Sequence, residues 1–452
     1  MKVCKFGGSS LADAQQIRKV CDIILADPER SIVVVSAPGK RHREDSKITD
    51  RLIALAHARI SAYDGEEEMK LITDRFRRMA VELGLGGDFG DAAENELRQR
   101  MERNARQPLD LMDALKSAGE DICAKLVTLC LQQMGQDAAY LSPLEAGLIV
   151  DDSNPGRVRV LPESYARIRK TLEQRHGITV FPGFFGYSES GKIRCFPRGG
   201  SDISGAILAA AVDADVYENW TDVDSVYAVN PDLVRSPLPL KEISYDEMRE
   251  LAYAGFTVLH EEALEPTAVK SIPINIRNTN NPHAPGSMIV PKRINYESVV
   301  TGIAGMKGFS VLHIYRYLMN QEVGYVLRVL EILKEFNVPF EHMPSSIDSI
   351  TLVLRDQVFT PDKEKRILKR LQEALHPDAM RVEHGYAIVM IIGDAMDRTV
   401  GVTSRATMAL SRAGINLDFI VQGVSQISVI FGISAPFCNC AVRELYKEFF
   451  LR

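Results

Sequence analysis

Five consecutive residues, Arg198-Gly199-Gly200-Ser201-Asp202, combine the features of an anion-binding site. The two glycines let the backbone approach a ligand closely, and the helix expected to start here offers unpaired N–H groups to an anion. The guanidinium of Arg198 can hold a carboxylate or a phosphate through two parallel hydrogen bonds. A tight loop in which Ser201 or Asp202 only caps the helix explains the same residues, so this segment alone does not decide between the two.

A second candidate phosphate site follows the first expected strand. Residues 2–6 read as a strand, Gly7-Gly8-Ser9-Ser10 as a turn and residues 12–26 as a helix. Backbone N–H groups in such a turn can cradle a phosphate, and Lys5 at the end of the strand adds a positive charge beside it. The turn lacks the Gly-Lys-Ser/Thr ending of a P-loop, so a structural turn with a surface lysine is the simpler interpretation of these residues alone.

The composition is that of a soluble globular protein of two or three domains. Of 452 residues, 46% are hydrophobic and 25% charged, and no apolar run approaches the length of a membrane span. A net charge of -6 argues against nucleic acid as the main partner. The seven cysteines are scattered without the spacing of a zinc site, which predicts reduced thiols in a cytosolic protein. The chain begins directly with a strand, so no signal peptide is expected.

Strands that alternate with helices predict an α/β domain with a mainly parallel sheet. Residues 32–36 form a continuous apolar run, as in strands that are buried on both faces. Strand patterns disappear over residues 56–119, which are expected to form a helical excursion from the sheet. Glu120 lies in the first turn of the next helix, where a glutamate also suits the helix dipole without any catalytic role. We expect a domain boundary near Tyr296.

The last third of the chain contains an internal repeat. A shift of 77 residues places residues 310–314 on 387–391, and Gly324 on Gly401. Each copy predicts the order strand, helix, strand, strand, helix. The first copy adds a last strand near residues 380–383, and the second has no room for one. We expect a strand at residues 299–304 to complete the second copy, so that the two copies interleave.

Five motifs, taken together, resemble those of the aspartate kinase (aspartokinase) family. They occur in the family's order and spacing and are Lys5-Phe6-Gly7-Gly8-Ser9-Ser10, Lys47-Ile48-Thr49-Asp50, Gly119-Glu120, Arg198-Gly199-Gly200-Ser201-Asp202 and Thr221-Asp222-Val223-Asp224-Ser225-Val226-Tyr227. The resemblance covers essentially the whole chain. Within the family, the chain is similar to the monofunctional, lysine-sensitive branch.

The resemblance implies an α/β amino-acid-kinase fold, with a mainly parallel sheet sandwiched by helices, over residues 1–296. Two interleaved ACT domains follow. They would comprise residues 306–384, and residues 385–452 together with the strand at 299–304.

The reaction that the resemblance implies is transfer of the γ-phosphoryl group of ATP to the side-chain carboxylate of L-aspartate. The product, 4-phospho-L-aspartate, begins lysine, threonine and methionine biosynthesis in the cytoplasm. Magnesium would accompany ATP, and no metal ligands of the protein are assigned. An ionised carboxylate is already a nucleophile, so catalysis requires positioning and charge stabilisation rather than a general base.

The resemblance also assigns roles to matching positions. Lys5 and Asp202 would be catalytic, with Lys5 meeting the ATP phosphates beside the N–H groups of the glycine turn. Arg198 would hold the α-carboxylate of aspartate and Glu120 its α-ammonium. The full set is Lys5, Gly7, Gly8, Ser9, Thr221, Asp222 and Tyr227 for ATP, and Thr49, Glu120, Phe184, Arg198, Gly199, Gly200 and Ser201 for aspartate.

Feedback regulation is implied for the first ACT copy. L-lysine is the expected effector and threonine the second choice, because an acid at Glu341 could pair with a lysine ε-ammonium. For the apolar residues among the matching positions, plain core packing is an equally good explanation. The matching positions are Met319, Gly324, Tyr325, Val326, Phe340, Glu341, Ser345 and Ser346. Paired ACT domains also imply a homodimer or homotetramer, since they present exposed sheet edges.

The sequence departs from the family pattern beside the nucleotide. Asp232 stands where an arginine is usual, Thr257 where a lysine is usual, and Pro197 replaces a glycine before Arg198. Two cations near ATP are therefore missing, and Arg235, Lys241 or a lysine in residues 40–47 are candidates to replace them.

Two other interpretations stay open. One is a different enzyme of the same fold, such as a glutamate or acetylglutamate kinase, against which the ACT repeat and the pair of Glu120 and Arg198 argue. The other is an amino-acid sensor with little catalytic activity, for which the missing cations argue.

Overall fold

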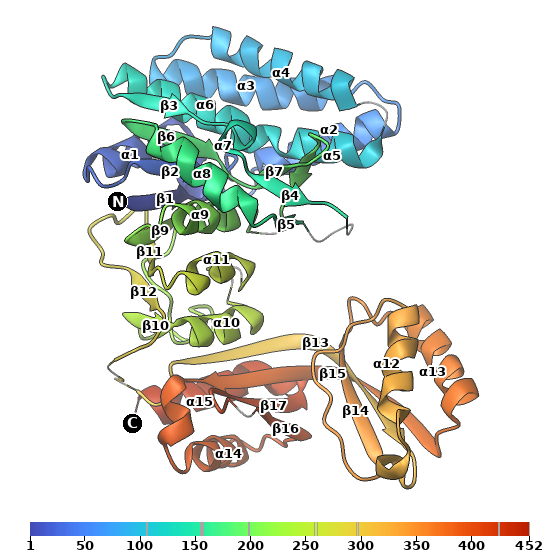
Figure 1. Cartoon of the computed structure of the whole chain (residues 1–452). Coiled ribbons are helices and arrows are strands. Elements are labelled where there is room, and N and C mark those ends of the chain that lie inside the picture. Colours follow the sequence, from blue (N-terminus) through green and yellow to red (C-terminus); the bar gives the residue numbers. More distant parts are fainter. Residues whose placement is uncertain are drawn as a thin grey trace. The chain divides into compact units, whose positions relative to one another are not determined.

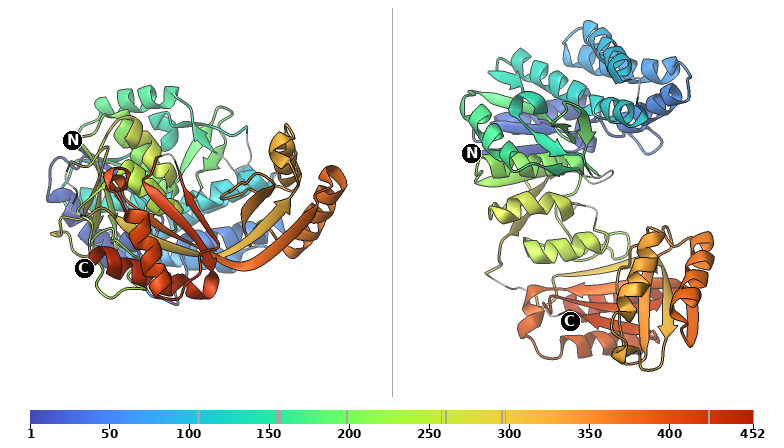
Figure 2. Two further views of the ribbon diagram at one scale, coloured as in Figure 1. Left: turned by 90° about the horizontal axis from the view of Figure 1, so that it is seen from below. Right: turned by 45° about the vertical axis from the view of Figure 1, so that its right-hand side comes forward.

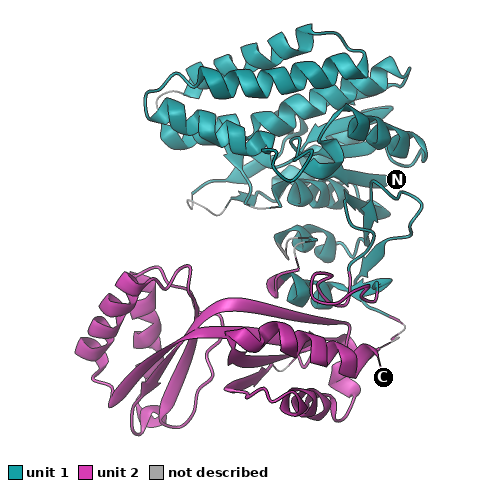
Figure 3. Cartoon of the chain, turned by 180° about the vertical axis from the view of Figure 1, so that it is seen from behind, with its two compact units in different colours: residues 1–226, 239–252, 257–293 teal, residues 227–238, 253–256, 294–452 magenta. Residues whose placement is uncertain are grey.

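The computed structural model describes residues 1–104, 107–153, 158–197, 199–256, 258–259, 261–294, 296, 298–423 and 425–451. The chain divides into two compact units (Figure 3). Unit 1 contains Met1–Val226, Pro239–Ala252 and Thr257–Arg293. Unit 2 contains Ile294–Arg452 and two segments from the region that the sequence assigned to the first domain, Tyr227–Leu238 and Tyr253–Phe256.

Unit 1 is built on an eight-stranded sheet of order β10-β12-β11-β9-β1-β2-β6-β3. All neighbouring strands are parallel except β11 and β12, as expected for strands that alternate with helices. Its strands are β1 (Lys2–Phe6), β2 (Ile32–Val35), β3 (Ala138–Tyr140), β6 (Ile178–Pro182), β9 (Val216–Thr221), β10 (Glu242–Ser244), β11 (Ile274–Asn278) and β12 (Ser287–Val290). A smaller sheet holds β5 (Arg159–Val160), β4 (Ile149–Asp151), β7 (Phe185–Ser188) and β8 (Ile193–Cys195).

Helices cover both faces of the main sheet (Figure 1). One face packs on α1 (Ala14–Leu25) and α6 (Ala118–Gln133), and the other on α9 (Gly200–Ala211). The side chains of each strand alternate between the two faces. Phe6 therefore points into the core under α1 and α6, while its neighbour Lys5 points toward α9. The remaining helices of this unit are α7 (Pro143–Ala146), α8 (Glu163–Glu173), α10 (Tyr245–Tyr253, whose last residue belongs to unit 2) and α11 (Leu264–Val269), with the short 3₁₀ helices η1 (Gly8–Leu11) and η2 (Glu261–Ala263).

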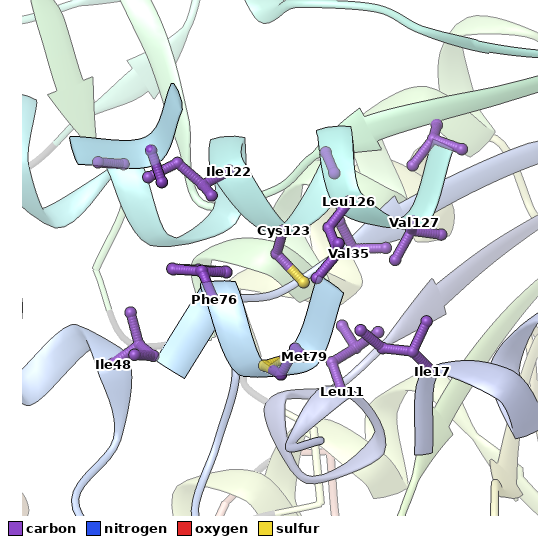
Figure 4. Packing of buried hydrophobic residues seen from close by; sticks show 14 of the residues in the cluster. Leu11, Ile17, Val35, Ile48, Phe76, Met79, Ile122, Cys123, Leu126 and Val127 are labelled. Carbon is purple, nitrogen blue, oxygen red and sulfur yellow. The ribbon is translucent and has the colours of Figure 1, made fainter. Parts of the chain in front are cut away.

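The predicted helical excursion is present and starts earlier than residue 56. It consists of α2 (Ile48–Ile60), α3 (Glu66–Leu83), α4 (Asp88–Asn104) and α5 (Pro108–Lys116). The excursion shares the core of the domain, because Phe76 and Met79 of α3 pack in the same cluster as Cys123 and Leu126 of α6 (Figure 4). It is therefore an integral layer of the unit.

Unit 2 has one antiparallel sheet of order β14-β13-β15-β17-β16. Two fourteen-residue strands, β13 (Gly302–Tyr315) and β15 (Ala379–Ile392), pair along almost their whole length (Figure 2). The other elements are β14 (Ser349–Arg355), β16 (Phe419–Gln422), β17 (Ser428–Ser434), α12 (Tyr325–Glu335), α13 (Pro361–Leu375), α14 (Val402–Arg412) and α15 (Cys438–Phe450), with the short 3₁₀ helices η3 (Met319–Gln321), η4 (Asp394–Arg398) and η5 (Ala435–Phe437).

The two repeat copies interleave as predicted, because the strand that completes the second copy comes from the start of β13. Residues 302–307 pair with 387–392, which also pair with β17, whereas residues 309–315 pair with β14. The strands expected at 299–304 and 380–383 are thus parts of longer strands that run through both halves of the sheet. The strand expected after the helix of the first copy is reduced to isolated bridges of His342 with Val353 and Ser345 with Ile350. Within the described residues, no helix has the length and apolar content needed to cross a bilayer.

Candidate active site and effector site

Lys5 lies at the carboxyl end of β1 and forms a buried ion pair with the first turn of α9. Its Nζ is 2.5 Å from Oδ1 of Asp202 and 3.5 Å from Oδ1 of Asn219. Asn219, the partner of Lys5 in the neighbouring strand β9, donates from Nδ2 to the same Asp202 oxygen at 2.8 Å. Ligands of parallel α/β sheets bind beyond the carboxyl ends of the strands, where this cluster lies. The cluster therefore holds a buried ammonium group that can stabilise an anionic ligand at this edge of the sheet.

The glycine turn after β1 packs tightly on the loop that follows β2. A Cβ on Gly8 would lie 2.8 Å from the carbonyl oxygen of Ala37, and the N–H of Gly39 donates to the Gly8 carbonyl at 2.8 Å. The N–H of Gly7 donates to the carbonyl of Trp220 at 2.9 Å and is therefore already used. Gly8 and Ser9 are therefore the candidates in this turn whose N–H groups could hold a phosphate.

Arg75 of α3 holds this loop from the excursion side. Its buried guanidinium donates to the carbonyls of Ser46 and Ala12 at 2.9 Å each, and to the carbonyl of Gly39. Burial lowers the pKa of Arg75, because few charges compensate its desolvation. Sequence patterns gave no signal for this role, since an arginine in an amphipathic helix usually faces solvent.

Glu120 lies in the first turn of α6, beside the carboxyl end of β2. Its side chain is buried, and its Oε2 has no hydrogen-bond partner within the protein. Burial raises the pKa of Glu120 to about 8. Gly119 makes this packing possible, because a Cβ there would lie 2.8 Å from the Ala37 Cβ. A buried carboxyl oxygen without a partner is a feature that an ammonium ligand would satisfy.

The loop after β6 closes on the start of α9. Phe184 has a φ of +80°, its N–H donates to Ser204 Oγ at 3.0 Å, and Lys116 Nζ lies 5.4 Å from its ring centre. A Cβ on Gly183 would lie 2.7 Å from the Ser201 Cβ, and one on Gly200 would lie 2.6 Å from the Phe184 ring. The structure thus brings together the predicted residues Phe184, Gly199, Gly200 and Ser201, and Gly199 has the left-handed φ of 76°. Arg198 lies outside the described residues.

Thr49 and the nucleotide-side residues occupy other parts of the same edge. Thr49 is half-buried in the first turn of α2. Thr221 ends β9, its hydroxyl donates to Asp222 Oδ1 at 3.2 Å, and Asp222 is exposed. Asp224, which the sequence did not single out, accepts from Asn278 Nδ2 at 2.8 Å and orders this turn. Tyr227 belongs to unit 2, and Thr257 lies outside the described residues.

Of the predicted effector residues, four lie between α12 and β14, and four lie at or just before the start of α12. Gly324 is its left-handed N-cap, Met319 and Tyr325 are buried, and the Tyr325 hydroxyl has no partner within the protein. Phe340 is 42% exposed, as an interface residue would be in a free chain. The other members of the set are half-buried Val326 and exposed Ser345 and Ser346.

Glu341 carries an ion pair that the sequence did not predict. Its Oε1 accepts from Arg355 Nε at 2.6 Å, and the Tyr253 hydroxyl donates to Oε2. Burial would raise the pKa of Glu341, but the hydrogen bonds from Arg355 and Tyr253 and the Arg355 charge together outweigh it and lower the pKa. Glu341 is therefore an ionised and occupied carboxylate, so a cationic ligand would compete with Arg355.

Comparison with known proteins identifies the chain's relatives. Residues 1–278 match the amino acid kinase family and residues 389–449 match the ACT domain. Aspartokinase 3 of Bacillus subtilis is 45% identical over 450 residues, which cover 100% of this chain and 99% of that protein. The chain belongs to the aspartokinase family.

Solved structures agree with this family. Aspartate kinase of Clostridium acetobutylicum matches with a TM-score of 0.88 and 36% identity, over 99% of this chain and 100% of that one. Aspartokinase III of E. coli, solved with aspartate and ADP, matches all of both chains with a TM-score of 0.80 at 24% identity, which shows the shared fold. The predicted amino-acid-kinase fold followed by ACT repeats is thus confirmed, and the chain is a kinase. Membership of the aspartokinase family argues against the two other interpretations, a kinase of the same fold with a different substrate and an amino-acid sensor.

Proposed function

We propose that the residues at the carboxyl edge of the main sheet carry out the aspartokinase reaction as follows. Lys5 stabilises the negative charge on the transferred γ-phosphoryl group, and Asp202 with Asn219 orients the Lys5 ammonium. The N–H groups of Gly8 and Ser9 hold the phosphates from the other side. The single observation that carries the proposal is the buried ion pair of Lys5 and Asp202 at the end of two parallel strands. Preorganised charge of this kind is the main catalytic resource for phosphoryl transfer.

L-Aspartate would lie between α6 and the start of α9. Glu120 takes its α-ammonium group, Arg198 its α-carboxylate, and Thr49, Phe184 and Ser201 complete the pocket. The buried Glu120 oxygen without a partner supports this assignment. Thr221, Asp222 and Tyr227 would contact the nucleotide. The side-chain carboxylate then attacks the γ-phosphorus directly, ADP leaves, and 4-phospho-L-aspartate forms.

Magnesium would arrive with ATP. In the described parts of the chain, no three His, Cys, Asp or Glu side chains gather as metal ligands. Mg²⁺ is commonly held by substrate phosphates with one or two carboxylates. The metal would neutralise phosphate charge, and Asp202 and Asp222 are the carboxylates nearest the proposed phosphate path.

L-Lysine is the proposed effector of the first ACT copy, residues 306–384, with threonine as the second candidate. An aspartokinase III of E. coli has been solved with lysine and aspartate. The second copy, residues 385–452 with the start of β13, would serve mainly for assembly. We infer a homodimer or homotetramer through these copies, since Val323 and Val400 at equivalent repeat positions are 99% and 100% exposed. The enzyme would work in the cytoplasm.

A hydroxamate assay with L-aspartate, L-glutamate and N-acetyl-L-glutamate tests the substrate assignment, because hydroxylamine traps any acyl phosphate. We expect product with L-aspartate only. Product with glutamate or acetylglutamate at a similar kcat/KM would overturn it.

A further inference from the structure

Arg100 of α4, a half-buried arginine, joins the helical excursion to the start of α6. Its Nη1 donates to the carbonyl of Ala114 and to Ser117 Oγ, both at 2.9 Å. Its Nη2 donates to Glu96 Oε1 at 2.7 Å and to Asp121 Oδ2 at 2.6 Å. The guanidinium thus bonds the end of α5, the residue between the helices and the first turn of α6.

This junction has no side-chain cap of its own. Ser117 is both the C-cap of α5 and the N-cap of α6, and at α6 its side chain makes no capping hydrogen bond. The Ser117 hydroxyl instead donates to Ala114 at 3.1 Å and accepts from Arg100. The direction in which α6 starts, and with it the place of Glu120 three residues later, therefore depends on Arg100.

Asp121, the neighbour of Glu120, carries the charge that Arg100 balances. Asp121 is buried, and its other contacts are Lys125 Nζ at 2.9 Å and the Tyr140 hydroxyl. Burial would raise the pKa of Asp121, but the Arg100 charge together with the Glu96, Lys125 and Tyr140 contacts outweighs it and keeps the pKa low. The Asp121 charge in turn raises the pKa of Glu120, after the larger effect of burial.

We propose that Arg100 is a positioning residue for substrate binding: it fixes the α5–α6 junction and pairs with Asp121, so that the Glu120 carboxyl group lies where the aspartate ammonium binds. The helical excursion thereby takes part in aspartate recognition without touching the substrate. The inference rests on the proposed role of Glu120.

Steady-state kinetics of Arg100→Lys and Ser117→Ala, with Arg98→Met as the matched control, test this proposal. Arg98 lies on the same helix and pairs with Glu66 and Glu94 at the surface. Arg100→Lys should raise the KM for L-aspartate about tenfold or more, the size expected for a displaced binding group, while kcat and the KM for MgATP change less than about threefold. Ser117→Ala should raise the KM for aspartate by a smaller factor, and Arg98→Met should change neither.

The pH profile gives a readout that a merely structural arginine would not move. The acid limb of kcat/KM for aspartate should shift to higher pH in a double variant, Arg100→Met with Lys125→Met, and stay in place in Arg98→Met. An unchanged KM for aspartate in both Arg100→Lys and Ser117→Ala overturns the inference while leaving the proposed site intact. If Glu120→Gln also leaves this KM unchanged, the proposed role of Glu120 fails first. Circular dichroism and thermal unfolding identify any variant that does not fold, in which case Ser117→Ala decides.

Discussion

Lys5 Nζ and Asp202 Oδ1 lie 2.5 Å apart, and each side chain is no more than 10% exposed. Burying two charges is costly unless they compensate each other, so a pair in this place is poor evidence for a stabilising role. It instead keeps an ammonium group preorganised at the carboxyl ends of β1 and β9. The catalytic role proposed for Lys5 depends on this arrangement.

Removal of the Lys5 charge should abolish most turnover. Lys5→Met is expected to lower kcat by on the order of 10²–10³, the effect of losing one preorganised charge donor. Lys2→Met is the matched control, because Lys2 lies on the same strand and pairs with Asp27 at the surface. Equal kcat values for the two variants would contradict the role of Lys5.

Binding of aspartate should weaken as the pH falls below about 8. The pKa of Glu120 is raised to about 8 by burial, so the free enzyme holds Glu120 protonated at lower pH. An ammonium ligand requires the ionised form, so the KM for aspartate should rise by up to about tenfold per pH unit below that value. Glu120→Gln should bind weakly at every pH and lose this dependence.

Glu120 should also make protein stability depend on pH. Because its folded-state pKa lies above its ordinary value, its contribution to stability is full at low pH and is lost as the pH rises through about 8. The free energy of unfolding of the wild type should therefore fall between about pH 4.5 and 8 relative to Glu120→Gln. Parallel denaturation curves at several pH values measure this difference, and a constant offset would contradict the raised pKa.

The close approach of Gly8 to the loop after β2 predicts a sensitive position. Gly8→Ala places a Cβ 2.8 Å from the Ala37 carbonyl, so the backbone must shift at a cost of about 1–3 kcal/mol. We expect a higher KM for MgATP and a lower melting temperature. Gly87→Ala is the control, since a Cβ there meets nothing within 4 Å. Similar behaviour of both variants would argue against a tight phosphate turn.

The ion pair of Glu341 and Arg355 predicts a direction for effector sensitivity. Arg355→Gln removes the internal competitor of a lysine ammonium and should lower the lysine concentration for half-inhibition about three- to tenfold. Glu341→Gln should raise it, and Arg370→Gln, which breaks an exposed pair with Glu335, should leave it unchanged. Weaker lysine inhibition in Arg355→Gln would show that Arg355 supports the effector.

Local patterns predicted the layers of the fold, whereas the site assignments at the carboxyl edge of the sheet came from the five motifs that resemble the aspartate kinase family. Lys5, Gly8 and Ser201 stand in glycine turns and helix starts that have signatures of their own. Arg75 and Arg100 could not be found in this way, since their partners are backbone carbonyls and carboxylates that only the tertiary fold brings near. The Trp220 partner of the Gly7 N–H was not predicted either, because the pairing of β1 with β9 is a long-range property.

The same limit applies in unit 2. The repeat revealed two copies, yet the pairing of β13 with β15 over fourteen residues depends on contacts between them. The Arg355 partner of Glu341 was missed for the same reason.

The release of ADP with MgATP and L-aspartate tests most directly whether Lys5 catalyses aspartate-dependent phosphoryl transfer. The account predicts that the wild type releases ADP only with aspartate, that millimolar L-lysine lowers the rate, and that Lys5→Met is almost inactive beside an active Lys2→Met. Folded wild-type protein that releases no ADP with aspartate, or a Lys5→Met variant that turns over normally, would contradict it.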